Sequence, residues 1–339
     1  MEGHMKRTLL YSFFLLSFLI AVAYSLYFYK QAHTFDKKMK EVLSDEVSLP
    51  TYHFAFIGEE MDHDYWRLVG AGAKKAAAEN DVFVEYEGPK RSNPEEQLKL
   101  LDMAIQAKVD GIIVQALNDS FTPLINKAVK EGIPVITIDT DAPDSLRLAY
   151  IGTDNYEAGR LAGQTLVKDT AGKAKIGIIT GGVDNAYKQH QLRVQGFKEA
   201  IEKIEGIKII AIDESNLTRV QAEEKAYKML KKHKDITAFY GTSSLDGIGI
   251  AAAARSLNRQ NDLYVISFDS LEENLDLLHK EEINAIVEQQ PYEMGQKSIE
   301  LMMHLVKQKS VPQMHHMNAA IIHSKDLDSM VEKMGNGHD

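Results

Sequence analysis

Cysteine is absent from this chain of 339 residues. The absence excludes disulfides, thiolate-bound zinc, cysteine nucleophiles and lipid attachment through cysteine. The fold must therefore depend on a packed apolar core. Apolar residues make up 44% of the chain and charged residues 26%, which is ordinary for a globular protein, and the length favours two lobes over a single core.

The short motifs of common catalytic and nucleotide-binding sites are also missing. Gly70 and Gly72 form a GxG within a helical pattern, but no third glycine follows at dinucleotide spacing. The chain has no GxxxxGKS/T phosphate loop, no GxSxG elbow and no HExxH motif. His315 and His316 are adjacent, so in an extended segment they point to opposite faces, and we expect them at the surface. We therefore expect no enzyme activity, no catalytic residues, no metal site and no cofactor.

Positive charge is scarce. The formal net charge is −10, with 49 acidic residues against 39 lysines and arginines. An acidic surface repels phosphate backbones, and no stripe of Lys and Arg interleaved with aromatic residues occurs. We expect no nucleic-acid partner.

One long uncharged run lies near the N-terminus. Residues 8–29 carry no charge and follow the basic pair Lys6 and Arg7. About 20 apolar residues are enough to span a bilayer, and a flanking basic pair favours a cytoplasmic N-terminus. We predict a cytoplasmic tip and transmembrane anchor over residues 1–30, with the rest of the chain extracellular and held to the cell membrane by a single pass.

A cleaved signal peptide is the alternative interpretation of this run. Ala21 to Ala23 has the small-x-small form of a cleavage site, and cleavage near Ala23 would release a secreted protein. The apolar run continues to Tyr29 without a polar segment or helix breaker, which favours the uncleaved anchor. Residues 31–50 are charged, lack glycine and end at Pro50, so we interpret them as a stalk.

Strand-like and helix-like patterns alternate from residue 52 onward. Leu98, Leu101 and Ile105, for example, recur at the spacing of one helix face. Such alternation predicts parallel sheets with helices on both faces. The stretch is too long for one doubly wound sheet, so we predict two lobes facing each other across a cleft. The predicted strands are residues 53–58, 82–88, 111–117, 134–139, 175–180, 207–213, 238–242, 264–269 and 284–289.

Three of these strands stop abruptly at a hydrogen-bonding side chain. Asp139 follows VITI, Asp269 follows VISF, and Gln289 follows AIVE. In open α/β sheets, ligands bind beyond the carboxyl ends of the strands. Each residue alone is also compatible with a cap on the next helix. Three such residues together favour side chains that converge on one small polar ligand.

Aromatic and basic side chains supply further candidates. The only tryptophan, Trp66, is adjacent to Tyr65 at the start of a predicted helix, with Asp64 as a possible N-cap. Two adjacent aromatic side chains are not expected to enter the same core, so we expect one to face the cleft. Arg193 lies in the first turns of a helix, where a cation opposes the helix dipole. That position indicates either a specific partner or simple exposure.

Taken together, these segments resemble the ribose/galactose-type periplasmic sugar-binding proteins. The resemblance covers about residues 52–335 and rests on IPVITIDTDAP, YIGTDNYEAGRLAG, RVQGF, YVISFDS and AIVEQQPYEMG. It implies an α/β fold of two doubly wound parallel-sheet lobes joined by a three-segment hinge, the type I periplasmic-binding-protein fold, here preceded by a transmembrane helix. It also implies that a monosaccharide is bound between the lobes.

The resemblance implies a set of ligand contacts and two discontinuous lobes. Asp246, one turn after Ser243, is included because it could reach the ligand. The first lobe would comprise residues 51–152 plus 291–313, and the second 153–290 plus 314–339. The implied ligand-binding residues are His63, Tyr65, Trp66, Asp139, Arg193, Ser243, Asp246, Asp269 and Gln289.

The chain departs from the ribose-binding pattern at three places. Thr140 stands where that pattern has Arg, and Leu217 stands where it usually has an aromatic residue before the helix near residue 218. Ser243 with Ser244 replaces Asn-Asp. The resemblance therefore favours a different pentose, such as arabinose or xylose, or a hexose.

The membrane anchor without a cysteine is a further departure. It resembles the tethered sugar-binding proteins of Firmicutes that present a sugar to a sensor histidine kinase. The implied partner is the extracellular domain of such a kinase. The alternative partner is the permease of an ABC sugar-uptake transporter. A transcription regulator of this fold would need a helix-turn-helix where the apolar run stands.

Overall fold

The computed structural model describes residues 22–34, 50–182 and 188–327. They fall into two regions, one up to Pro50 and one from Thr51 onward. In the first region, residues 22–34 form a helix with exposed side chains. Within the described ranges, no helix is both long and apolar enough to cross a membrane. Residues 8–21, which make up most of the predicted anchor, lie outside the described residues, as does most of the predicted stalk.

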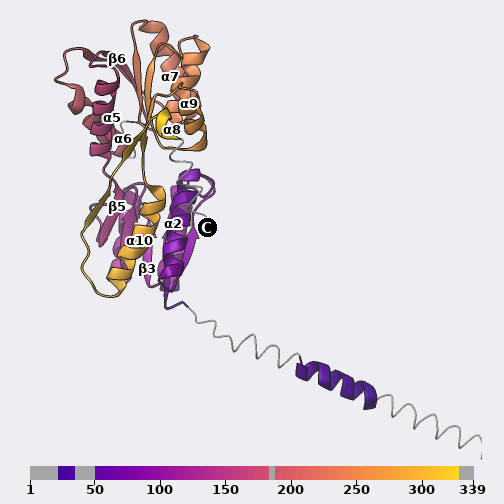
Figure 1. Cartoon of the computed structure of the whole chain (residues 1–339). Coiled ribbons are helices and arrows are strands. Elements are labelled where there is room, and N and C mark those ends of the chain that lie inside the picture. The colour runs from indigo at the N-terminus through magenta and orange to yellow at the C-terminus, as the bar shows by residue number, and fades with distance from the viewer. Residues whose placement is uncertain (1–21, 35–49, 183–187, 328–339) are drawn as a thin grey trace, which may run out of the picture. The chain divides into compact units, whose positions relative to one another are not determined.

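The second region contains two six-stranded sheets (Figure 1). The strand order of the first sheet is β11-β5-β4-β3-β1-β2, and all its strand pairs are parallel. Its elements are β1 (Tyr52–Ile57), α2 (Asp64–Glu79), β2 (Val82–Glu87), α3 (Pro94–Ala107), β3 (Gly111–Val114), η1 (Asp119–Phe121), α4 (Thr122–Lys130), β4 (Val135–Ile138), β5 (Ala149–Thr153), α10 (Pro291–Val306) and β11 (Met314–Met317).

The second sheet repeats this plan in the order β12-β10-β9-β8-β6-β7. Its pairs are parallel except for β12, which runs antiparallel to β10. Its elements are α5 (Asn155–Asp169), β6 (Ala174–Thr180), α6 (Lys188–Ile201), β7 (Ile207–Glu214), α7 (Arg219–Lys232), β8 (Ala238–Gly241), α8 (Ser244–Ser256), β9 (Tyr264–Phe268), α9 (Glu272–His279), β10 (Ala285–Glu288), β12 (Ala320–Ile322) and η3 (Ser324–Asp326).

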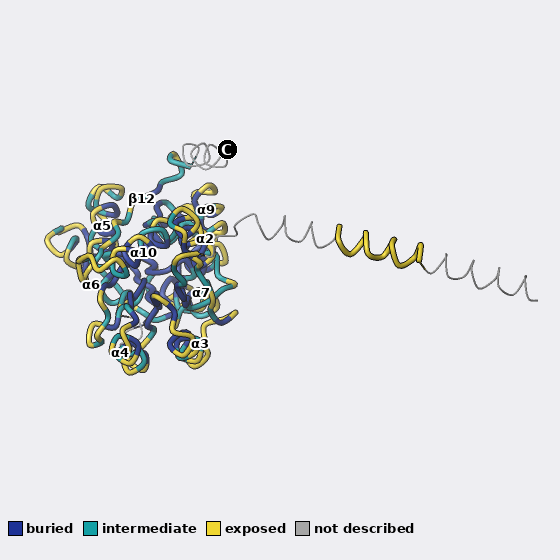
Figure 2. The backbone as a smooth tube through the Cα atoms, turned by 90° about the horizontal axis from the view of Figure 1, so that it is seen from below, coloured by how far each residue is buried: buried dark blue, intermediate teal, exposed yellow. Residues whose placement is uncertain are grey.

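Each sheet is covered by helices on both faces, which confirms the predicted fold class of two parallel-sheet lobes. In the first lobe, α2 and α10 pack on one face and α3 and α4 on the other. In the second lobe, α5 and α6 cover one face and α7, α8 and α9 the other. The buried backbone lies in the interior, and exposed positions line the outer helices (Figure 2). Continuous apolar strands such as VITI are fully buried because both faces are covered.

The chain passes between the two sheets three times. The first passage follows β5 at Asp154, the second follows β10 at Gln289 and Gln290, and the third is the short link between β11 and β12. Helix α10 lies beside α2 although the two are far apart in the sequence (Figure 1). These passages place the carboxyl ends of both sets of strands around one space.

Two details differ from the sequence analysis. Strands β5, β11 and β12 were not predicted; the five residues of β5, AYIGT, include a glycine and lack a long Val/Ile run. The boundary at residue 314 was also wrong. Residues 314–317 pair with β5 in the first sheet, because four consecutive backbone partners are available at that open edge. The third passage therefore lies between residues 317 and 320.

Candidate ligand-binding site

A cavity of about 530 Å³ lies between the two lobes at the carboxyl ends of their strands. Cavities of about 300–1,000 Å³ are typical of small-molecule sites. Both lobes and the second passage between them contribute to its wall. Eight of the nine predicted residues line it, namely His63, Tyr65, Trp66, Asp139, Arg193, Ser243, Asp269 and Gln289.

The two strand-end aspartates are held by the same backbone device. Asp139 and Asp269 have φ angles of 62° and 67°, in the left-handed region that Asp tolerates better than most residues. The N–H of Asp139 donates to the carbonyl of Ile151 (2.8 Å), and that of Asp269 donates to the carbonyl of Val287 (2.9 Å). Each acceptor belongs to the next strand of its sheet, so each aspartate turns off its strand at the same point.

In the first lobe, three side chains donate hydrogen bonds to the Asp139 carboxylate. The Tyr65 hydroxyl reaches Oδ1 at 2.8 Å, and the Gln115 amide and the Thr140 hydroxyl reach Oδ2 at 2.9 and 3.2 Å. Burial raises the pKa of Asp139, while the Tyr65 hydrogen bond and the Arg193 charge oppose the rise. No helix begins at Asp139, so the capping interpretation does not apply to it.

Glu59 places a second carboxylate in the same wall. Its Oε1 accepts from the Ser92 hydroxyl (2.8 Å) and its Oε2 from the Gln115 amide (3.2 Å), so one amide group joins Glu59 to Asp139. Burial raises the pKa of Glu59, and the charge of Asp139 adds to the rise. The Oε1 atom of Gln115 is buried and has no partner among the described residues. The first lobe therefore presents an acidic half-site.

In the second lobe, Asp269 is held by a residue of the passage between the lobes. The Gln289 amide donates to Asp269 Oδ1 at 2.6 Å, and the Gln289 Oε1 accepts from the Thr153 hydroxyl at 2.7 Å. The Asp269 side chain does not cap α9, whose N-cap residue is Leu271 and has no side-chain cap bond. The capping interpretation is therefore wrong for Asp269 as well.

Arg193 supplies positive charge to this cavity. Its side chain is buried, with 5% of the residue exposed, so simple exposure is excluded. Its Nε donates to Asn155 Oδ1 and its Nη1 to the carbonyl of Thr242, both at 2.8 Å. The guanidinium lies 4.0 Å from the centre of the Phe268 ring, a cation–π contact. These contacts fix the cation in the second lobe while its charge acts on Asp139 of the first.

The two adjacent aromatic residues correct the sequence analysis. Tyr65 and Trp66 are 8% and 3% exposed and belong to the same core cluster. Both fit because their rings meet edge to face, 5.6 Å apart at 80°. Each still lines the cavity, and the Tyr65 hydroxyl serves Asp139. The N-cap of α2 is His63, whose Nδ1 accepts from the N–H of Tyr65, rather than Asp64.

Asp246 is the predicted residue that the structure places elsewhere. It is fully buried behind the wall and does not line the cavity. Its carboxylate accepts from the Ser215 hydroxyl at 2.6 Å and from the Thr242 hydroxyl at 3.3 Å. Ser243 lines the cavity, but its hydroxyl caps α8 by accepting from the N–H of Asp246. The turn of helix between them points Asp246 inward, into the lobe.

Several wall residues were missed by the sequence analysis. Gln115 follows the strand GIIV as Asp139 follows VITI, and Glu59 follows β1 after one glycine, so the strand-end argument applied to them too. Asn155 lies within the quoted segment YIGTDNYEAG. His190 gave no signal in the sequence. Burial and the nearby Arg193 charge lower its pKa to about 3, so its ring is neutral.

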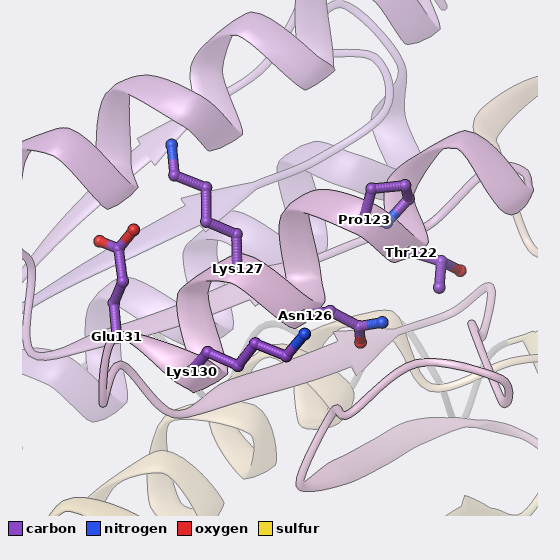
Figure 3. Close-up of a pocket in the computed structure, with 6 residues that line it drawn as sticks. All are labelled: Thr122, Pro123, Asn126, Lys127, Lys130 and Glu131. Atoms are coloured by element: carbon purple, nitrogen blue, oxygen red, sulfur yellow. The ribbon is translucent and has the colours of Figure 1, made fainter.

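Other hollows lack such convergence. One of about 600 Å³ lies along α4, where Lys127 and Lys130 extend in different directions (Figure 3). Lys127 is already paired with Asp102 at 2.8 Å. Another, of about 740 Å³, lies between α6 and β7 beside Ile212. Ligand sites are marked by a few converging polar groups in a concave wall, and the cavity between the lobes meets that criterion best.

Comparison with known proteins decides the family. The family model described as "Periplasmic binding protein domain" matches residues 54–310. The chain belongs to this family. The D-allose-binding periplasmic protein of Escherichia coli is 23% identical over 269 residues, which cover 76% of this chain and 86% of that protein.

Solved structures of the family are closer in sequence. GanP, a glucose-galactose binding protein from Geobacillus stearothermophilus, is 52% identical with a TM-score of 0.77, covering 81% of this chain and 98% of that one. XylFII in the XylFII-LytSN complex is 35% identical with a TM-score of 0.72, covering 81% and 98%. The D-allose-binding periplasmic protein and GanP are described as binding proteins, in agreement with the expectation that the chain is not an enzyme.

Proposed function

We propose that this protein is an extracytoplasmic monosaccharide receptor that closes on its sugar. The observation that carries the proposal is the cavity of about 530 Å³ whose polar groups come from both lobes, with Asp139 on one side and Arg193 and Asp269 on the other. Carboxylates and a fixed guanidinium bind sugar hydroxyls through charge-assisted hydrogen bonds. A ligand bonded to both sides favours the closed arrangement, because it gains contacts there that the open one lacks.

The ligand contacts of this proposal are the eight predicted residues in the wall, together with Glu59, Gln115, Asn155 and His190. Within the monosaccharides, a hexose is favoured, since the relative at 52% identity is a glucose-galactose binding protein. The acidic first half-site also suits a ligand with many hydroxyl donors. A pentose such as arabinose or xylose remains the second choice, supported by an arabinose-binding relative at 28% identity.

The receptor is further proposed to be anchored by residues 8–29 and to signal to the extracellular domain of a sensor histidine kinase. The uncharged run supports the anchor. The XylFII-LytSN complex supports a protein partner, since a relative at 35% identity was solved with one. The alternative is delivery of the sugar to an ABC permease, which a relative described as part of a sugar ABC transporter supports.

A thermal-shift panel on the full chain in detergent tests the sugar. A ligand at 100 times its dissociation constant adds roughly 2.7 kcal/mol of stability, which raises the midpoint by several degrees. The panel contains glucose, galactose, arabinose, xylose, ribose and allose. The absence of any shift would contradict the receptor proposal. A sugar-dependent complex with a kinase extracellular domain supports signalling, whereas a complex only with a permease supports transport.

A further inference from the structure

A buried carboxylate lies behind the cavity wall in the second lobe. Asp246 has no exposed surface, and its carboxylate accepts hydrogen bonds from two hydroxyls. Ser215 directly follows strand β7, and Thr242 directly follows strand β8. Burial raises its pKa, and the hydrogen bonds from Ser215, Ser243 and Thr242 oppose the rise. These three side chains and a backbone hydrogen bond from Ser243 therefore stabilise the charge of Asp246.

Ser215, the first of the two hydroxyl donors, lies next to a strained turn in the cavity wall. Asn216 and Leu217, which line the cavity, have φ angles of 48° and 52°. Leucine rarely adopts this left-handed conformation, which costs roughly 1–2 kcal/mol. The turn is retained because the Ser215 oxygen accepts from the N–H of Leu217 (3.2 Å) while its hydroxyl donates to Asp246 (2.6 Å). Asp246 therefore orients the hydroxyl that holds this turn.

Thr242, the second hydroxyl donor, contacts the ring of His190. The Thr242 hydroxyl has one proton, and two oxygens lie 3.3 Å from it, Asp246 Oδ2 and the Thr180 hydroxyl. A carboxylate can only accept, whereas the Thr180 hydroxyl can also donate, so we assign the proton to Asp246 Oδ2. The Thr242 oxygen then accepts from the N–H of Gly181 (3.2 Å) and from His190 Nδ1 (3.0 Å). His190 is neutral, so its single ring proton is on Nδ1 and Nε2 is an acceptor.

We propose that Asp246 is a positioning residue: without touching the ligand, it fixes the tautomer of His190 through Thr242 and the Asn216–Leu217 turn through Ser215. In this way it determines which donors and acceptors the second lobe presents to a sugar. The inference rests on the proposed function, but its tautomer component is independent of any ligand.

The test records the side-chain nitrogens of His190 by NMR in the full chain labelled with ¹⁵N-histidine, assigned by their loss in His190→Gln. Asp246→Ala is expected to shift the His190 nitrogens toward the Nε2–H tautomer and to weaken binding of the best sugar of the panel by about tenfold. Thr242→Val is expected to change the His190 signals, whereas Ser215→Ala is expected to weaken binding while leaving them unchanged. Ser298→Ala, which removes a buried hydroxyl bonded to Gly295 in α10, is the control and should change neither.

Unchanged His190 signals together with an unchanged sugar affinity in Asp246→Ala would overturn the inference. If Asp246→Ala does not fold, Ser215→Ala and Thr242→Val test the inference instead. A wild-type sugar affinity in both variants would overturn the inference. If the wild-type chain binds no sugar, the proposed function fails, while the His190 signals of the ligand-free protein still confirm or refute the tautomer assignment.

Discussion

The two lobes hold their strand-end aspartates alike at the backbone but differently at the side chain. Asp139 is bonded by Tyr65, Gln115 and Thr140, all from its own lobe. Asp269 is bonded instead by Gln289, a residue of the passage between the lobes. The first half-site is therefore complete within its lobe, whereas the second depends on the geometry of the hinge.

The charges of the two half-sites differ as well. The first wall carries Glu59 and Asp139, both half-buried with raised pKa values, and the second carries Arg193 and Asp269. A buried carboxylate without a cation is costly, and the Arg193 charge stabilises Asp139 across the cavity. The second lobe therefore acts on Asp139 in two ways, because the Arg193 charge lowers its pKa whereas the Asp269 charge raises it.

Removal of the Arg193 cation is expected to have the largest effect. In Arg193→Met, the apolar stem remains but the groups that bond Asn155 and the Thr242 carbonyl are lost. Loss of a buried, hydrogen-bonded charge typically costs about 2–5 kcal/mol of binding, so we expect sugar affinity to fall by roughly 30-fold or more. Isothermal titration calorimetry measures the dissociation constant of the sugar for the wild type and the variant.

Arg160→Met is the matched control for this substitution. Arg160 lies on α5 and pairs with Glu157 at the surface, outside the cavity wall. Exposed pairs contribute only about 0–1 kcal/mol, so its sugar affinity should equal that of the wild type. Equal affinities for Arg193→Met and Arg160→Met would end the argument for charge complementarity between the lobes.

The next largest effect is expected in the pH dependence of stability, through the buried Asp246 of the second lobe. Burial raises the pKa of Asp246 to about 6 from the ordinary 3.8. Its contribution to stability is therefore complete below about pH 4 and is lost as the pH rises through 6, by about 3 kcal/mol in all. Asp246→Asn does not titrate, so chemical unfolding of this variant between pH 4 and 7 should lack that loss.

The wild type and Asp246→Asn share the other buried groups whose pKa values are shifted. Glu59 and Asp139 of the first lobe act in the same direction as Asp246, and His190, held neutral, acts in the opposite one. Tyr240, which interacts with Asp246, has a raised pKa and stays neutral in this range. These contributions cancel in the difference between wild type and variant. A flat difference across the range would show that Asp246 is not titrating near 6.

Helix packing provides a third comparison between the lobes. A Cβ on Gly159 would lie 2.1 Å from the carbonyl oxygen of Arg193, and one on Gly72 would lie 1.9 Å from that of Tyr292. Overpacking costs about 1–3 kcal/mol, so Gly159→Ala and Gly72→Ala should both lower the thermal midpoint. Gly159→Ala alone displaces the backbone of Arg193, so it should also weaken sugar binding several-fold. Equal affinities in the two variants would contradict this view of α5 as a support for Arg193.

The sequence was sufficient for the features that depend on local pattern. Buried Val/Ile runs identified nine of the twelve strands in the described residues, and their polar ends identified Asp139, Asp269 and Gln289 as parts of one wall. It was insufficient for β11, whose membership in the first sheet depends on backbone pairing with the unpredicted β5.

Side-chain direction was the other quantity that the pattern could not supply. Asp246 is separated from Ser243 by less than one helical turn, yet one faces the lobe interior and the other the cavity. Tyr65 and Trp66 share a core because of the angle between their rings. His190 and Arg193 depend on the rotation of α6 about its axis. These directions are set by tertiary packing, which a single sequence does not reveal.

Loss of the Thr153 hydroxyl is expected to have the smallest effect and addresses the hinge directly. Thr153 ends β5, directly before the first passage, and Gln289 lies in the second passage. Their 2.7 Å bond orients the amide that holds Asp269. Thr153→Val keeps the shape but removes the donor, which typically costs about 0.5–1.5 kcal/mol, so we expect affinity to fall by roughly 3- to 10-fold. Thr165→Val, at another buried threonine on α5, should bind sugar normally.

A double variant shows whether Thr153 acts through Gln289. If it does, Thr153→Val combined with Gln289→Ala should bind no more weakly than Gln289→Ala alone, because the amide that Thr153 orients is already gone. Additive losses would instead assign Thr153 a separate role in the first lobe. The non-additive result would tie Asp269, and not Asp139, to the hinge, so that movement of the lobes changes one half-site while the other stays preformed.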